Sequence, residues 1–182
     1  MITREKTKEF IDRAYKCACE HGFHDKELSV EHYLMLVITE ISEAVEADRS
    51  GLHANVAGFE KCVGLTYEDR FRNYVKDSVE DELADVCIRL YDICGALGLD
   101  IDCECGFDAE HESWYMSRTF CELCYSLSAR VVGIVDDMSY GVQECLRFCY
   151  SIAHVNGIDL ERHIELKMQY NESRPVKHGK KY

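Results

Sequence analysis

Residues 79–90 read VEDELADVCIRL, and this stretch decides the fold class. Apolar residues recur in it at intervals of three and four, which predicts an α-helix with one apolar face made of Leu83, Val86, Cys87 and Leu90. Glu82 and Asp85 lie three residues apart, so both carboxylates project beside that face, one turn from each other. A carboxylate next to the buried side of a helix costs free energy unless something neutralises its charge.

The same arrangement occurs earlier in the chain. Residues 34–45 read LMLVITEISEAV, which places Glu40 and Glu43 three residues apart beside another apolar face. If the two helices face each other, four carboxylates meet, and their mutual repulsion raises their pKa values unless a cation lies between them. Hard divalent cations with oxygen ligands suit such a cluster best. We therefore predict a Mg²⁺ site, with Mn²⁺ as an alternative, at Glu40, Glu43, Glu82 and Asp85.

Glu-x-x-Glu on one helix followed by Glu-x-x-Asp on a later helix resembles the MazG-like family of all-α nucleoside triphosphate pyrophosphohydrolases. The ending KMQYNESRPVKHGKKY, residues 167–182, also resembles that family, as does the turn GIDL at residues 157–160. The resemblance covers about residues 28–98 and 140–182, and the residues between have no counterpart. The gap between the two acid pairs is longer than in most relatives.

This resemblance implies Mg²⁺-dependent hydrolysis of a nucleoside triphosphate, with ribose or deoxyribose, to the monophosphate and pyrophosphate. Glu43 would then also orient the attacking water or accept its proton. Relatives are usually homodimers or dimers of dimers, so the resemblance also implies a homo-oligomer. The alternative, from another functional class, is a non-catalytic helical protein that binds a metal or a nucleotide, or serves assembly.

The C-terminal residues supply positive charge. Lys167, Asn171 and Arg174 share one face of the predicted last helix, where the two cations can neutralise phosphates and the amide can bond a phosphate or sugar hydroxyl. The tail that follows would close over the triphosphate with Lys177, His178, Lys180 and Lys181. A frayed, solvated basic terminus is the alternative for that tail.

The composition bounds the function. The chain has 182 residues, one proline and a net charge of −13, which fits a single all-α domain over residues 1–182 with a basic tail at 175–182. The negative charge argues against binding a nucleic-acid polymer. No apolar run is long enough for a membrane span and the N-terminus does not read as a signal peptide, so we expect no membrane partner and a cytoplasmic location.

The helix signals predict a bundle of about six helices. Residues 51–66 read as a loop or short helical pieces, residues 99–117 as a polar surface excursion, and an extra helix precedes the C-terminal one. The predicted helices cover about residues 3–20, 29–50, 66–76, 78–98, 117–135, 140–154 and 159–172. Glu80 and Asp81 fall in a first helical turn, where the helix dipole favours acids. His24 and Asp25 read as loop residues.

Eleven cysteines without a secretory signal indicate reduced thiols, many of them packed in helix faces. A second interpretation is a zinc site, which would use Cys103, Cys105, Cys121 and Cys124. The sequence also repeats weakly: CIRL at residues 87–90 resembles CLRF at 145–148, and each is followed by a glycine, Gly98 or Gly157. The second copy has no matching acid pair. Either a duplicated hairpin or convergent helix-ending chemistry explains it.

Overall fold

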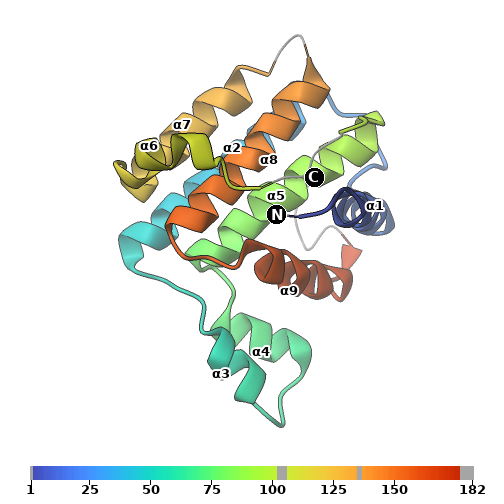
Figure 1. Ribbon diagram of the computed structural model, residues 1–182. Helices are drawn as coiled ribbons and strands as arrows, with labels where there is room; N and C mark the ends of the chain where they lie inside the picture. The colour runs from blue at the N-terminus through green and yellow to red at the C-terminus, as the bar shows by residue number, and fades with distance from the viewer. Residues whose placement is uncertain (1, 102–105, 135–136, 177–182) are drawn as a thin grey trace.

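The computed structural model describes residues 2–101, 106–134 and 137–176, and every regular element in these ranges is a helix (Figure 1). The six long helices are α1 (Arg4–Glu20), α2 (Val30–Ser50), α5 (Val79–Leu97), α7 (Phe120–Val132), α8 (Met138–Val155) and α9 (Leu160–Glu172). Three short ones are α3 (Val56–Lys61), α4 (Tyr67–Tyr74) and α6 (Glu112–Met116), and a 3₁₀ turn precedes α6 at Ala109–His111. The all-α class is confirmed. The described helices include α3 and α6 in addition to the seven predicted ranges, because these two short helices lie in segments that the sequence indicated mainly as irregular.

Polar caps fix where the helices begin. The side chains of Thr3, Ser29 and Ser78 each accept a hydrogen bond from a backbone N–H of the following turn. At the other ends of α2 and α5, Gly51 and Gly98 adopt left-handed φ angles of 66° and 62°. Both acid-bearing helices therefore begin and end at defined residues.

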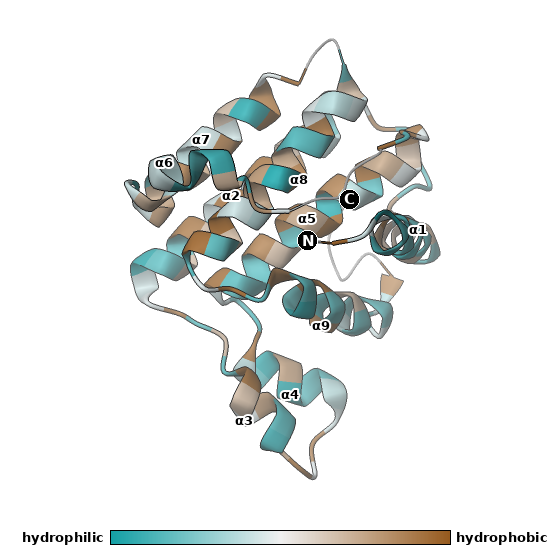
Figure 2. Cartoon of the chain, in the orientation of Figure 1, coloured by the Kyte–Doolittle hydropathy of each residue, from teal (hydrophilic) through white to brown (hydrophobic). Residues whose placement is uncertain are grey.

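The central element is α5, which packs against α1, α2, α8 and α9. Figure 1 shows α1 on one side of it and α7 with α8 on the other, while α2 lies behind. Figure 2 shows apolar residues along the part of α5 that these helices cover. Leu90 and Tyr91 are fully buried there, and Tyr91 contacts Phe10 of α1 with ring centroids 5.6 Å apart. None of the described helices is both long and apolar enough to cross a membrane.

A smaller apolar cluster lies under the α3–α4 hairpin, which projects from one end of the bundle (Figure 1). Phe59 and Phe71 of the hairpin pack with Leu166 and Tyr170 of α9. The rings of Phe71 and Tyr170 stack 4.4 Å apart at 12°, and the hydroxyl of Tyr67 donates to the carbonyl of Leu166 at 2.7 Å. These contacts hold α9 against the segment that leads into α5.

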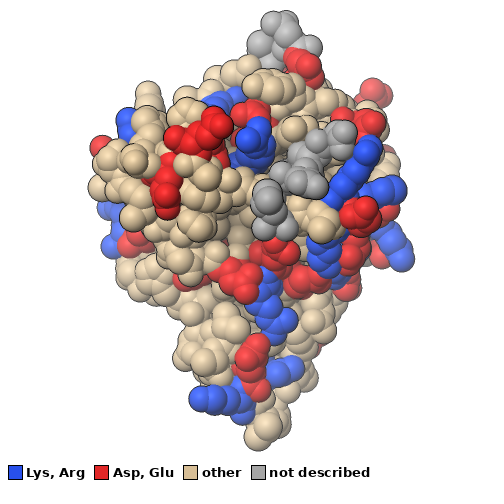
Figure 3. Space-filling view, in the orientation of Figure 1, with Lys and Arg blue, Asp and Glu red and all other residues tan. Residues whose placement is uncertain are grey.

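Ion pairs join the first and last helices. Arg13 of α1 lies 2.6 Å from Glu165 and 3.1 Å from Glu172 of α9, and Lys6 also pairs with Glu165. Figure 3 shows basic and acidic side chains interleaved over these two helices. Residues 106–117 pack down through Trp114 and Tyr115, which both contact the ring of Phe148 in α8.

Candidate metal centre

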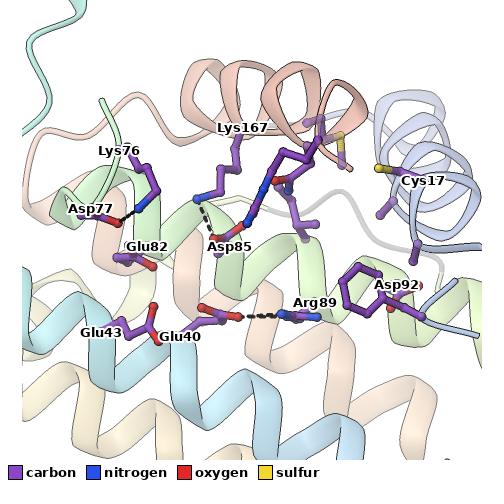
Figure 4. Close-up of a pocket in the computed structure, with 17 residues that line it drawn as sticks. Cys17, Glu40, Glu43, Lys76, Asp77, Glu82, Asp85, Arg89, Asp92 and Lys167 are labelled. Atoms are coloured by element: carbon purple, nitrogen blue, oxygen red, sulfur yellow. Dashed lines mark hydrogen bonds and ion pairs between the residues drawn. The ribbon is translucent and has the colours of Figure 1, made fainter. Parts of the chain in front are cut away.

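A cavity of about 180 Å³ opens between α1, α2, α5 and α9 (Figure 4). All four predicted acids line it, Glu40 and Glu43 from α2 and Glu82 and Asp85 from α5. One carboxylate oxygen from each of Glu40, Glu82 and Asp85 lies within 4.8 Å of the other two. Glu43 lies one turn further along α2 and is exposed. Three of the four acids therefore form a set of converging oxygens that can hold a divalent cation, with Glu43 at its edge.

The carboxylate of Glu82 has no hydrogen-bond or ion-pair partner among the described residues, although the exposed fraction of the residue is only 5%. Burial raises the pKa of Glu82 to about 8, and the charges of Asp85 and Asp81 act in the same direction while Lys167 opposes them. A buried carboxylate without a partner is costly. A divalent cation would remove that cost, so this residue fits a metal ligand.

Glu40 has a fixed partner. Arg89, one turn beyond Asp85 on α5, holds Glu40 Oε1 at 2.9 Å, and Glu40 is buried. Burial and the charge of Asp85 raise the pKa of Glu40, and Arg89 counteracts both. The sequence analysis did not identify Arg89 as a member of the centre. Its position four residues after Asp85, on the same side of the helix, was the available signal.

Lys167 lies at the acid centre itself. Its ammonium is 2.8 Å from Asp81 Oδ2 and 2.7 Å from Asp85 Oδ2, and the residue is 4% exposed (Figure 4). Burial alone would lower the pKa of Lys167, but the carboxylates of Asp85 and Asp81 raise it, so the side chain stays charged. The helix dipole was therefore an incomplete account of Asp81, which is 0% exposed and binds a cation from another helix.

The loop before α5 forms the rim of the centre. Lys76 and Asp77 both line the cavity and pair with each other. Asp77 has a φ of 62°, the left-handed conformation, and among the described residues no other non-glycine residue adopts it. Its N–H donates to Asp81 Oδ2 at 3.0 Å, which holds the turn. Asp77, Asp81 and Glu82 make a second group of carboxylate oxygens within 4.8 Å of one another.

Three of the predicted phosphate-binding residues line the cavity, Lys167, Asn171 and Arg174, but the ammonium of Lys167 is already bound by Asp81 and Asp85. The guanidinium of Arg174 lies over the ring of Tyr170, 5.5 Å from its centroid, and the backbone carbonyl oxygen of Arg174 is 2.7 Å from His21 Nε2. The remaining predicted members, Lys177, His178, Lys180 and Lys181, lie outside the described residues.

Apolar residues and a thiol also line the cavity, among them Ala14, Cys17 and Phe23. His24 lies in the loop region as predicted, but its main contact is Asp92 of α5, with Nε2 2.7 Å from Oδ1. The hydrogen bond to Asp92 raises the pKa of His24. This pair ties the α1–α2 connection to α5, a contact that sequence spacing did not reveal.

The zinc hypothesis concerns residues that are only partly described. Cys103 and Cys105 lie outside the described residues, Cys121 is exposed on α7, and Cys124 is buried in the core. Buried thiols also occur in the packed helix faces, including Cys87 and Cys145.

Comparison of the chain with protein-family models, curated proteins and solved structures finds no match, so no family is identified.

Proposed function

We propose that the chain is a divalent-metal-dependent hydrolase that converts a nucleoside triphosphate to the monophosphate and pyrophosphate. The observation that carries the proposal is the convergence of Glu40, Glu82 and Asp85, from two helices, at one end of a cavity. Glu82 in particular is buried and lacks a partner among the described residues. An all-oxygen set of this kind suits Mg²⁺ or Mn²⁺.

A bound Mg²⁺ ion would supply positive charge for phosphate oxygens and lower the pKa of a water molecule. The chain's own groups then have separate roles. Glu43 is exposed at the edge of the acid set, where it can accept a proton from the attacking water. Asn171 and Arg174 offer an amide and a guanidinium to the phosphate chain from α9.

The choice of the bond that breaks comes from the MazG-like resemblance. Clustered carboxylates serve attack at the α- or γ-phosphorus equally well. The chain has no Gly-x-x-x-x-Gly-Lys-Ser/Thr loop, the motif that cradles phosphates for γ-transfer in one large class of enzymes. The resemblance favours the α-phosphorus, with pyrophosphate as the leaving group, and a homo-oligomeric assembly.

A non-catalytic metal- or nucleotide-binding protein is the second candidate. Two ion pairs favour it: Arg89 neutralises Glu40, and Lys167 neutralises Asp85. A cluster that is partly neutralised from within can serve structure alone. Turnover separates the two candidates, because a binding protein would retain the metal and leave every nucleotide intact.

The test is incubation with a panel of NTPs and dNTPs in Mg²⁺. We expect monophosphate and pyrophosphate in equal amounts, and in ¹⁸O-labelled water the label should appear on the monophosphate. The Glu82→Gln variant, purified in the same way, controls for contaminating hydrolases. Orthophosphate and diphosphate as first products would overturn the choice of bond, and no turnover of any nucleotide would overturn the enzymatic proposal.

A further inference from the structure

The acid centre contains two groups of carboxylates that differ in one respect. The first, Glu40, Glu82 and Asp85, and the second, Asp77, Asp81 and Glu82, each bring three oxygens within 4.8 Å of one another and share Glu82. The second group already has a cation, because the Lys167 ammonium lies 2.8 Å from Asp81. The same ammonium lies 2.7 Å from Asp85 and so touches both groups.

The surroundings of Asp81 indicate that the second group depends on the positive charge of Lys167. The residue is 0% exposed, its Oδ2 accepts from Lys167 and from the Asp77 N–H, and its Oδ1 has no hydrogen-bond partner among the described residues. A wholly buried carboxylate is costly unless a cation compensates its charge or the group takes up a proton, and here the cation is Lys167. Lys167, at 4% exposed, is equally dependent on the acids.

We propose that the Lys167 ammonium permanently fills a second cation position of this centre, so that the chain binds one divalent ion, and that removing the ammonium opens the second position to another divalent ion. The proposal rests on the proposed metal centre at Glu40, Glu82 and Asp85. It specifies the number of ions and identifies the residue that sets it.

The charges around the cavity support this number. The carboxylates that line the cavity are Glu40, Glu43, Asp77, Glu82, Asp85 and Asp92, and Asp81 lies behind Lys167. Four cations face these seven acids, Lys76, Arg89, Lys167 and Arg174, so three negative charges remain when all of these groups are ionised. One divalent ion leaves a single negative charge, whereas two would reverse the sign. Without Lys167, four negative charges remain, and two divalent ions balance them.

Lys167 is a positioning residue in this scheme. It lies on α9, and Asn171 and Arg174 follow it by one and two turns and line the same cavity. The ammonium therefore docks α9 against α5 and places these two side chains near the acid set, without itself being available for phosphate.

The experiment counts Mn²⁺ ions bound per chain at saturation by electron paramagnetic resonance, on full-length protein freed of metal beforehand. We expect one ion for wild type, two for Lys167→Met, and one for the double variant Asp81→Asn/Lys167→Met, which removes the acid together with its cation. The control is Lys6→Met, which removes a lysine of α1 that pairs with Glu165 of α9 and changes the net charge by the same amount. This variant should bind one Mn²⁺ ion. Thermal melting should show Lys167→Met gaining more stability from Mn²⁺ than wild type does.

One ion in both wild type and Lys167→Met, or two in wild type, would overturn this inference and leave the metal centre standing. Zero ions in wild type would overturn the metal centre itself. A Lys167→Met chain that stays unfolded in millimolar Mn²⁺, while the double variant folds, would also overturn the inference, because a divalent ion would then have failed to replace the ammonium.

Discussion

Helices α5 and α8 are neighbours of similar length, but α5 buries several acidic side chains and α8 buries none. They have 19 and 18 residues, pack against each other, and carry the related sequences CIRL and CLRF. Within α5 the buried residues include the acids Asp81, Glu82 and Asp92. Within α8 they are apolar apart from Ser151, whose hydroxyl donates to a carbonyl of its own helix.

The two matching arginines show why. Arg89 of α5 crosses to Glu40 on α2, in a mostly buried pair, whereas Arg147 of α8 pairs with Glu144 three residues earlier on its own exposed face. Two of the three buried acids on α5 have a partner from elsewhere in the chain: Lys167 of α9 lies 2.8 Å from Asp81, and His24 lies 2.7 Å from Asp92. The buried side of α8 carries no acid, and the cation that reaches it, Arg130 of α7, lies over the ring of Phe148, 4.1 Å from its centroid. The acid centre therefore lies on α5 and has no equivalent on α8 among the described residues.

The largest effect is expected on nucleotide turnover, from substitution of Glu82, a buried acid of α5 that has no counterpart on α8. Glu82→Gln should lower nucleotide turnover by more than about 100-fold, since even groups that merely orient a metal ligand contribute about 10–100-fold. Glu144→Gln, the same change on α8, should leave turnover unchanged. Steady-state rates in saturating Mg²⁺ measure both. Near wild-type activity of Glu82→Gln would place the reaction elsewhere.

The second effect is on stability against pH in the metal-free protein. The pKa of Glu82 is about 8 when folded and 4.5 in its ordinary state, so between these values the folded chain holds a proton that the unfolded chain has released. The free energy of unfolding should therefore fall by a few kcal/mol as the pH rises through that window. Glu40, whose pKa is also raised by burial, acts with the same sign.

Urea denaturation in the presence of a chelator, from about pH 5 to pH 9, measures this slope. Glu82→Gln should flatten the slope, whereas Glu144→Gln should reproduce the wild-type curve. Parallel curves for wild type and Glu82→Gln would show that Glu82 is not the group that titrates.

The third effect separates the two arginines. Arg89→Met leaves Glu40 buried without its partner and should cost about 2–3 kcal/mol of unfolding free energy, somewhat less than the figure for a wholly buried pair because Arg89 is partly exposed. Arg147→Met breaks an exposed pair on one helix and should cost less than about 0.5 kcal/mol. Equal costs in metal-free denaturation would erase the distinction between the two helices.

The smallest effect tests what α5 and α8 have in common. Gly98 and Gly157 follow these helices with φ angles of 62° and 69°, and an added Cβ would meet no atom within 4 Å at either position. Alanine should therefore cost about 1 kcal/mol at each, from backbone strain alone. Matching shifts in the melting temperature would support an equivalent helix ending, and a clear difference would argue against it.

The sequence predicted the helices and the four acids because both depend on local spacing. Periodicity located α5, and two acid pairs identified Glu40, Glu43, Glu82 and Asp85. The sequence did not reveal the partners of Asp81 and Asp92, because Lys167 lies 86 residues from Asp81 and His24 lies 68 residues from Asp92. A long-range ion pair between buried groups leaves no local periodicity. The short helices α3 and α6 were likewise uncertain, since few residues offer little pattern.

The contacts of α9 also set an order for folding during synthesis. The apolar cluster under the α3–α4 hairpin is completed by Leu166 and Tyr170, and the buried charge of Asp81 is compensated by Lys167. All three residues leave the ribosome long after the segments that need them. The nascent chain must therefore carry an open hairpin and an uncompensated acid until α9 is made, so the acid centre is finished only after α9 has been synthesised.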